Sequence, residues 1–160
     1  MTAPDPAASI AERELTLSRL IPAPRHALYR AWTEPALLCR WFAPRPWTTP
    51  RAELDVRPGG SNLIVMRSPE GEEYPNRGVY LEVESDRRLV FTDAFVEAWI
   101  PSEKPFMTAF ITLEDEAGST RYTARVLHWS VADREAHEQM GFHTGWGQCA
   151  DQLAEVARGV

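Results

Sequence analysis

Residues 51–129 restrict the possible fold more than any other part of the chain, because their hydrophobic pattern repeats every two residues. Ala52, Leu54 and Val56, for example, alternate with charged side chains. A period of two places alternate side chains on one face of a β-strand. Turn signals such as Pro58-Gly59-Gly60 separate the segments. Together they predict consecutive antiparallel strands over residues 51–57, 61–67, 78–85, 88–94, 106–115 and 119–129.

The C-terminal part of the chain has a helical period instead. Its large apolar residues recur at spacings of 4, 3, 4 and 3, at Phe142, Trp146, Cys149, Leu153 and Val156. Such a stripe is typical of a helix that buries one face. We therefore expect one long helix, with Asp133 as its N-cap and its end at about Arg158.

The first 50 residues predict one strand and two short helices. Residues 12–21 alternate like a strand, which the prolines at 22 and 24 end. A helical face follows over residues 24–32, and we expect Thr33 to cap a second short helix that ends before Pro44. Residues 1–11 are small and Pro-rich, so we expect a loose tail, followed by one domain over residues 12–160.

The order of these elements predicts an α+β fold. Strands do not alternate with helices, so a doubly wound parallel sheet is excluded. We expect a curved antiparallel sheet of about seven strands, in the order β-α-α-β6-α, wrapped around the long C-terminal helix. A curled sheet and a straight helix do not meet along their whole length, so a cavity between them is a natural consequence.

Large side chains on the inner faces of these elements are candidates for the cavity wall. The entrance would lie between a loop at residues 96–105, the short second helix and the start of the long helix. We expect His128, His143 and Tyr80 to supply the polar contacts. The alternative is that the same side chains fill a solid core. The candidates are Trp41, Phe42, Met66, Tyr80, Phe91, Phe95, Trp99, Tyr122, His128, Met140, His143 and Trp146.

Composition excludes several kinds of partner. The net charge is −6, and 17 Lys and Arg residues are scattered among 23 acidic ones. Nucleic acid requires a gathered basic surface, so it is not an expected partner. No stretch approaches the ~18 apolar residues of a membrane span. The N-terminus has no apolar run of a signal peptide, and the cysteines form no CxxC pair. The cytoplasm is the expected location.

Motifs for chemistry are scarce. The chain has no G-x-S-x-G, P-loop or G-x-G-x-x-G sequence. His128, His137 and His143 lack the spacing of a zinc site, so no metal or other cofactor is expected. Either His128 or His143 could act as a general base if it reached the cavity. Cys39 and Cys149 stand at apolar helical positions and are expected to be inert thiols.

Three short elements carry a resemblance to a known family. They are Trp32-Thr33-Glu34-Pro35, Arg57-Pro58-Gly59-Gly60 and Gly145-Trp146, in this order. Over residues 12–158 the chain resembles the bacterial homologues of the activator of heat-shock-protein-90 ATPase (AHSA-type), in the START/SRPBCC superfamily. The resemblance implies the helix-grip fold, a hydrophobic cavity, and ligands that in relatives are lipids, polyketides or hormone-like molecules. It also implies a chaperone partner and a link to the stress response.

Three functional hypotheses follow. The first is a protein that binds a small apolar molecule, lipid or aromatic, in the cavity. The second is a stress-linked co-chaperone module that acts through its outer surface and has a filled interior. The third is a cavity enzyme, a cyclase or hydrolase, that uses His128 or His143; no catalytic residue is assigned. The aromatic content is compatible with a homodimer.

Overall fold

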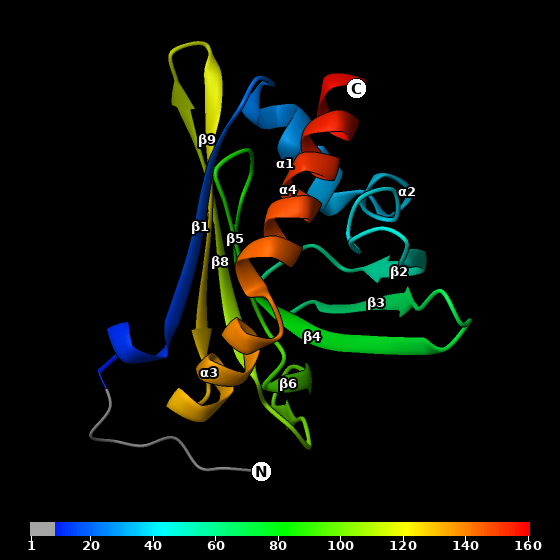
Figure 1. Ribbon diagram of the computed structural model, residues 1–160, viewed down its shortest axis with the longest axis vertical. Helices are drawn as coiled ribbons and strands as arrows, with labels where there is room; N and C mark the ends of the chain where they lie inside the picture. The colour runs from blue at the N-terminus through cyan, green and yellow to red at the C-terminus, as the bar shows by residue number, and fades with distance from the viewer. Residues whose placement is uncertain (1–8) are drawn as a thin grey trace.

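The computed structural model describes residues 9–160, and it confirms the α+β fold (Figure 1). A 7-stranded antiparallel sheet has the order β1-β9-β8-β5-β4-β3-β2. Its strands are β1 (Glu14–Ile21), β2 (Thr48–Leu54), β3 (Ser61–Arg67), β4 (Glu73–Glu84), β5 (Arg88–Thr92), β8 (Met107–Glu116) and β9 (Ser119–His128). The helices are α1 (Arg25–Thr33), α2 (Pro35–Leu38), α3 (Val131–Gln139) and α4 (Phe142–Arg158), with a 3₁₀ turn at Ala11–Arg13.

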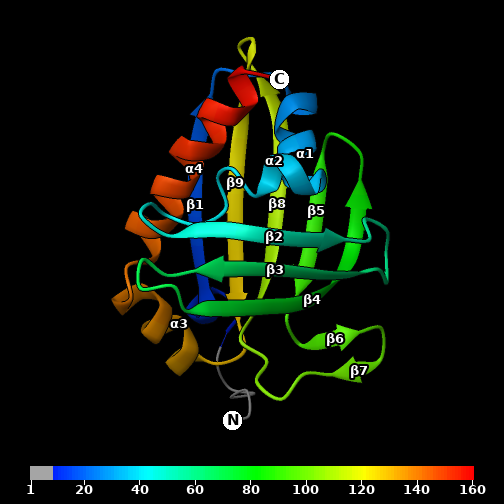
Figure 2. The same cartoon turned by 90° about the vertical axis from the view of Figure 1, so that its right-hand side faces the viewer.

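The sheet bends strongly between its two halves. In Figure 2, β2, β3 and β4 run across the direction of β1, β9 and β8. The pairing of β4 with β5 shifts by one residue between Tyr80 and Glu82. A bulge of this kind bends the bulged strand and increases its twist. The bend produces a concave face, and α1 and α4 lie on that face (Figure 1).

The core forms where α4 meets the half of the sheet built from β1, β9 and β8. Strict alternation in β9 predicts that Tyr122, Ala124, Val126 and His128 point inward, and the structure confirms it, since each is at most 2% exposed. Leu153 of α4 is 0% exposed within the same cluster. The alternating pattern therefore identified the inner face of this strand correctly.

A long C-terminal helix is present and ends at Arg158 as expected, but its expected start at residue 133 was wrong. The helix is broken at Gly141, which has a φ of 93° and separates α3 from α4. A residue in the left-handed region cannot continue a right-handed helix, and glycine adopts this conformation at little cost. The N-cap of α3 is Ser130, whose Oγ accepts a hydrogen bond of 3.1 Å from the backbone N–H of Asp133. Asp133 is therefore in the first turn and is not the cap.

Other boundaries also differ from the expectations. Residues 96–105 are not a plain loop, because β6 (Phe95–Glu97) and β7 (Ile100–Pro101) pair as a small separate sheet. Thr33 ends α1, where its hydroxyl donates to the carbonyl of Tyr29 at 2.7 Å, and so it does not cap α2. The expected tail at residues 1–11 lies mostly outside the described residues. Within residues 9–160, no helix is long and apolar enough to cross a membrane.

Candidate functional site

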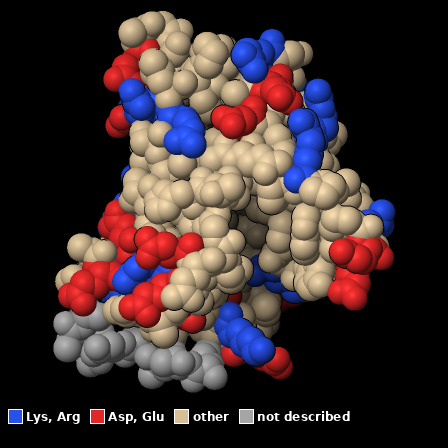
Figure 3. Space-filling view, in the orientation of Figure 1, with Lys and Arg blue, Asp and Glu red and all other residues tan. Residues whose placement is uncertain are grey.

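A cavity of about 420 Å³ lies on the concave side of the sheet, under the first half of α4. Figure 3 shows its mouth as a hollow between the α3–α4 junction and the β3–β4 region, surrounded mainly by uncharged surface. Its wall consists of Trp32, Trp41, Phe42, Pro44, Asn62, Ile64, Met66, Asn76, Arg77, Gly78, Phe91, Thr92, Asp93, Phe106, Met107, Tyr122, His137, Met140, Gly141, Phe142, Gly145, Trp146 and Cys149. The wall is mainly apolar, with polar groups at particular points.

One part of the wall is an aromatic cluster at the end of α1. The ring centroids of Trp32 and Trp41 are 4.8 Å apart, and those of Trp32 and Phe91 are 5.6 Å apart. Trp41 is fixed further because its indole N–H donates to the carbonyl of Ala31 at 3.0 Å. Edge-to-face aromatic contacts of this kind stabilise one arrangement of the rings beyond simple burial. The cluster is therefore a preformed apolar surface.

The first turns of α4 supply a second aromatic surface. The rings of Phe142 and Trp146 stack with centroids 5.2 Å apart. Both residues lie on the apolar stripe of α4, but only Phe142 is fully buried, and Trp146 keeps part of its ring accessible. Gly145 lies between them in the sequence and leaves open space, because a Cβ atom added there would meet no other atom within 4 Å.

A directed chain of hydrogen bonds connects the cavity to the 3₁₀ turn before β1. His128 Nδ1 lies 2.8 Å from the carbonyl of Arg13, and His128 Nε2 lies 2.8 Å from His137 Nδ1. The carbonyl can only accept, so His128 carries its proton on Nδ1 and accepts at Nε2. His137 must then donate from Nδ1, which leaves its Nε2 to accept from the indole N–H of Trp146 at 3.4 Å. The geometry assigns a neutral tautomer to both imidazoles.

Burial reinforces this neutral state. Burial, together with a smaller effect of the neighbouring His128 in the same direction, lowers the pKa of His137 to about 4. Burial also lowers the pKa of His128, against the opposing effect of its hydrogen bond to Arg13. At neutral pH the cavity therefore presents uncharged imidazole. His137 is a weak base there, because the lone pair on its Nε2 already accepts a hydrogen bond from the indole N–H of Trp146.

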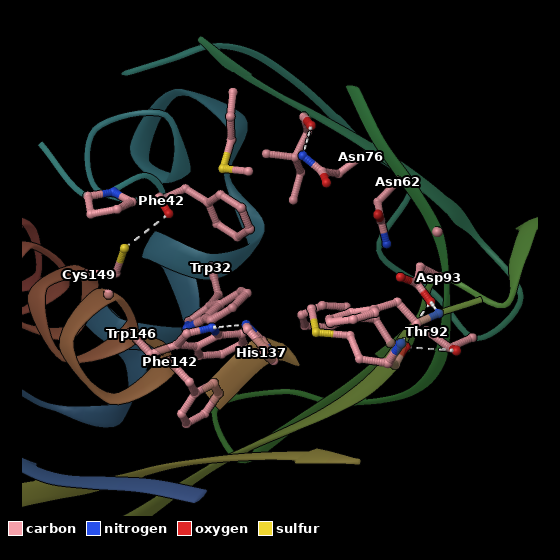
Figure 4. A pocket seen from close by; sticks show the side chains of 18 of the residues that line it. Trp32, Phe42, Asn62, Asn76, Thr92, Asp93, His137, Phe142, Trp146 and Cys149 are labelled. Carbon is pink, nitrogen blue, oxygen red and sulfur yellow. Dashed lines mark hydrogen bonds between the residues drawn. The ribbon is translucent and has the colours of Figure 1, made fainter. Parts of the chain in front are cut away.

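A second polar region lies on the other side of the cavity, where β3, β4 and β5 meet. Figure 4 shows Asn62, Thr92 and Asp93 there, opposite Trp32, Phe142 and Trp146. One carboxylate oxygen of Asp93 accepts the backbone N–H groups of Phe106 and Met107 at 2.7 and 3.0 Å. Burial nevertheless raises the pKa of Asp93, since these two bonds only partly offset the loss of solvent.

The structure places part of the expected residue set in the cavity wall. These residues are Trp41, Phe42, Met66, Phe91, Tyr122, Met140 and Trp146. Whether they contact a ligand stays a prediction. The alternative of a solid core does not describe this region, because the space between their side chains is unfilled.

Five expected residues lie elsewhere, and they are corrections to the expected site. Tyr80 is buried, and it lies further along β4 than the residues that line the cavity. Its ring centroid is 6.5 Å from that of Phe91. His128 is 1% exposed and lies behind His137. His143 is exposed, because the break at residue 141 sets the start of α4 with Phe142 inward.

Phe95 and Trp99 belong to the small β6–β7 sheet instead of the cavity. Their rings contact each other with centroids 6.4 Å apart. Trp99 is 89% exposed and has a φ of 68°, at the turn between the two strands. The expectation that Phe95 and Trp99 line the cavity was therefore wrong.

Sequence reasoning missed most of the polar wall and some aromatic residues. Trp32 and Phe142 were recognised as buried helix residues, but not as cavity residues. Asn62 and Asp93 had no distinguishing pattern, because each is a single polar residue in or beside an apolar strand. His137 reaches the cavity only because α3 departs from the axis of α4. Its position in the sequence could not reveal that turn.

Two further observations bear on the chemistry of the cavity. Burial raises the pKa of the Cys149 thiol to about 12, and its sulfur lies 3.3 Å from the carbonyl of Phe42. The thiol therefore stays protonated and is a poor nucleophile. Across residues 9–160 there is no group of three or more His, Cys, Asp and Glu side chains that could hold a metal ion.

Comparisons with known proteins agree with this architecture. Residues 22–158 match the family described as "Activator of Hsp90 ATPase homolog 1-like protein". A solved structure of a protein from Nitrosomonas europaea is 42% identical, with a TM-score of 0.89 and coverage of 92% of this chain and 96% of that one. None of the curated proteins matches the chain.

More distant solved structures share the fold alone. A protein from Rhodobacter sphaeroides is 21% identical, with a TM-score of 0.80 over 98% of this chain and 97% of that one. An "AHSA1-like protein" from Aeromonas hydrophila is 20% identical, with a TM-score of 0.70 over 91% and 92% of the two chains. The same bent sheet and C-terminal helix thus persist at low sequence identity.

Proposed function

The chain belongs to the family of Activator of Hsp90 ATPase homolog 1-like proteins, and we propose that it binds a small, mainly apolar molecule in the cavity between the sheet and α4. The observation that carries the proposal is a cavity of about 420 Å³ whose wall is largely aromatic. Ligand sites in proteins typically have volumes of roughly 300–1,000 Å³, apolar walls and a few placed polar groups. The cavity has all three properties.

The energetics favour an apolar ligand. A molecule that buries about 300 Å² of apolar surface gains ~7 kcal/mol at about 25 cal/mol per Å², before the entropy lost on binding. The aromatic cluster around Trp32 is already held by edge contacts, so little reordering is needed there. The neutral histidines add no charge that such a ligand would have to displace.

A fluorescent probe tests this proposal directly. N-phenyl-1-naphthylamine is neutral and apolar, and its fluorescence rises in an apolar site. Gly145→Leu should place a side chain in the cavity and weaken probe binding by about tenfold, because the space at Gly145 is open. The same change removes a glycine from a helix and should not lower stability. Titration of the probe, with thermal unfolding of each variant, measures both effects.

Thr144→Leu is the matched control, because Thr144 is the exposed neighbour of Gly145 on α4 and does not line the cavity. It should bind the probe like the unchanged protein. If the Gly145→Leu variant bound the probe as tightly as the unchanged protein, the probe would lie outside the cavity. Absence of binding to the unchanged protein, together with no co-purified molecule in native mass spectrometry, would reject the proposal.

A chaperone partner is the second candidate, and the family to which the chain belongs favours it. If a chaperone is the partner, the outer surface should bind Hsp90 whether or not the cavity is blocked. A pull-down with purified bacterial Hsp90 should then give equal capture of the unchanged protein and the Gly145→Leu variant. A stress-related role, a cytoplasmic location and a homodimer stay predictions. Catalysis by His128 or His143 has no geometric support, since neither lines the cavity.

A further inference from the structure

The polar side of the cavity contains a buried amide without a protein partner. Asn62, on β3, is 8% exposed, and its side chain forms no hydrogen bond with any described residue. Figure 4 shows this amide directed into the cavity. The amide atoms are not sealed from the cavity, so a ligand that excludes water there leaves them unpaired unless it supplies a hydrogen bond itself. A ligand group that pairs with Asn62 would therefore gain affinity.

Asp93 supplies an acceptor on the same side. Its Oδ1 is held by the backbone N–H groups of Phe106 and Met107, whereas its Oδ2 accepts no hydrogen bond from the residues described here. Asp93 also forms no ion pair within this part of the chain. The two bonds to Oδ1 fix the direction of the carboxyl group, and Figure 4 shows it facing the same space as Asn62.

We propose that Asn62 and Asp93 together recognise a hydroxyl group on an otherwise apolar ligand. The amide N–H of Asn62 would donate to the hydroxyl oxygen, and Asp93 Oδ2 would accept the hydroxyl proton. A hydroxyl is both donor and acceptor, so one atom satisfies both protein groups. This inference rests on the proposed binding function and names the chemical class of the ligand.

A ligand carboxylate fits the same site less well. Arg77 lines this side of the cavity and has no ion pair among residues 9–160, so it could attract an anion. Its side chain is exposed, however, and solvent screens such an attraction. Asp93 is more buried and would repel a second carboxylate beside it. A neutral hydroxyl avoids this repulsion.

An isomeric pair of ligands tests the assignment. 1-Octanol and methyl heptyl ether have the same atoms, but only the alcohol can donate a hydrogen bond. Each is titrated as a competitor of N-phenyl-1-naphthylamine. We expect the alcohol to displace the probe with a dissociation constant about tenfold lower than that of the ether. Without protein partners the alcohol should bind more weakly, because burying a free hydroxyl is unfavourable.

Asp93→Asn isolates the acceptor. The amide oxygen can keep the two backbone bonds at Oδ1, while an NH₂ group replaces the free oxygen. Binding of 1-octanol should weaken about tenfold, with little change for the ether. Asp151→Asn makes the same charge change on the exposed face of α4 and should keep the preference for the alcohol. Asn62→Leu removes the donor and provides an independent test if the first variant does not fold.

The outcomes separate this inference from the binding function. Equal displacement by the alcohol and the ether, or displacement by neither, overturns the hydroxyl assignment while probe binding still supports the cavity function. Tighter binding of octanoate than of 1-octanol overturns it in favour of an anion at Arg77. Absence of probe binding rejects the cavity function, and the hydroxyl assignment with it.

Discussion

The two halves of α4 pack against the sheet in different ways. In the C-terminal half, Leu153 is 0%, Val156 5% and Ala157 1% exposed, so the helix is flush with the core. In the N-terminal half, Gly145, Trp146 and Cys149 line an open cavity. The same apolar stripe thus contributes to the filled core in one half and borders the cavity in the other. Periodicity alone does not distinguish these two uses.

The cause lies in what faces each half. Helix α4 packs closely against α1 and β1, and its C-terminal half contributes Leu153, Val156 and Ala157 to the filled core. The N-terminal half faces the bend of the sheet, where β3 and β4 turn away from β8 and β9 (Figure 2). The helix also changes direction at Gly141, between α3 and α4. Packing is therefore tight where the sheet runs beside the helix and open where it curves away.

The largest expected effect of a substitution is in the tight half. Leu153→Ala should lower the free energy of unfolding by about 3 kcal/mol, because it creates a cavity in a filled region. Cys149→Ala should cost about 1 kcal/mol or less, because Cys149 already borders open space. Urea denaturation of both variants measures the contrast. Equal costs would mean that the two halves are packed alike.

The junction should show a smaller effect. Gly141→Ala forces a side chain into the left-handed region and should destabilise the protein by about 1–2 kcal/mol. Gly145→Ala, in the body of α4, should instead stabilise it by up to about 1 kcal/mol, since alanine is the better helix former. Thermal unfolding of this glycine pair tests the break directly. Stabilisation by both substitutions would indicate that α3 and α4 can join into one helix.

The pH dependence of stability should be smaller still. The pKa of His137 is about 4 in the folded protein, below its value of about 6.5 in the unfolded chain. The unfolded state therefore binds more protons between these values, and stability falls as the pH drops from 6.5 towards 4. We expect a loss of about 1 kcal/mol, because the imidazole is partly exposed and solvent reduces the effect.

Urea denaturation at pH 7 and pH 4.5 would measure this loss. His137→Gln should reduce the difference between the two pH values. His143→Gln should leave it unchanged, because His143 lies exposed on the outer side of α4. A similar reduction in both variants would show that the pH dependence does not come from His137.

Residues of the site could be predicted from the sequence where they lie on regular strands and helices. Tyr122 and Phe91 were placed on the correct face because strands alternate over their length. Trp146 followed from the apolar stripe of α4. His143 was misplaced because it lies beside the helix break at Gly141. Trp99 was expected at the cavity as part of a loop without a pattern, and it lies instead at the turn of the β6–β7 hairpin. Periodic patterns carry no information across such interruptions.

The sequence by itself determined the order of the seven main strands and of α1, α2 and α4, and the antiparallel sheet, because these depend on local periodicity and turn residues. Only the tertiary structure decided how far the sheet bends, where α4 leaves it, and which polar groups meet in the gap. Asn62 comes from β3, Asp93 from the bend after β5, and His137 from α3. Their meeting depends on packing between distant segments, which no local pattern encodes.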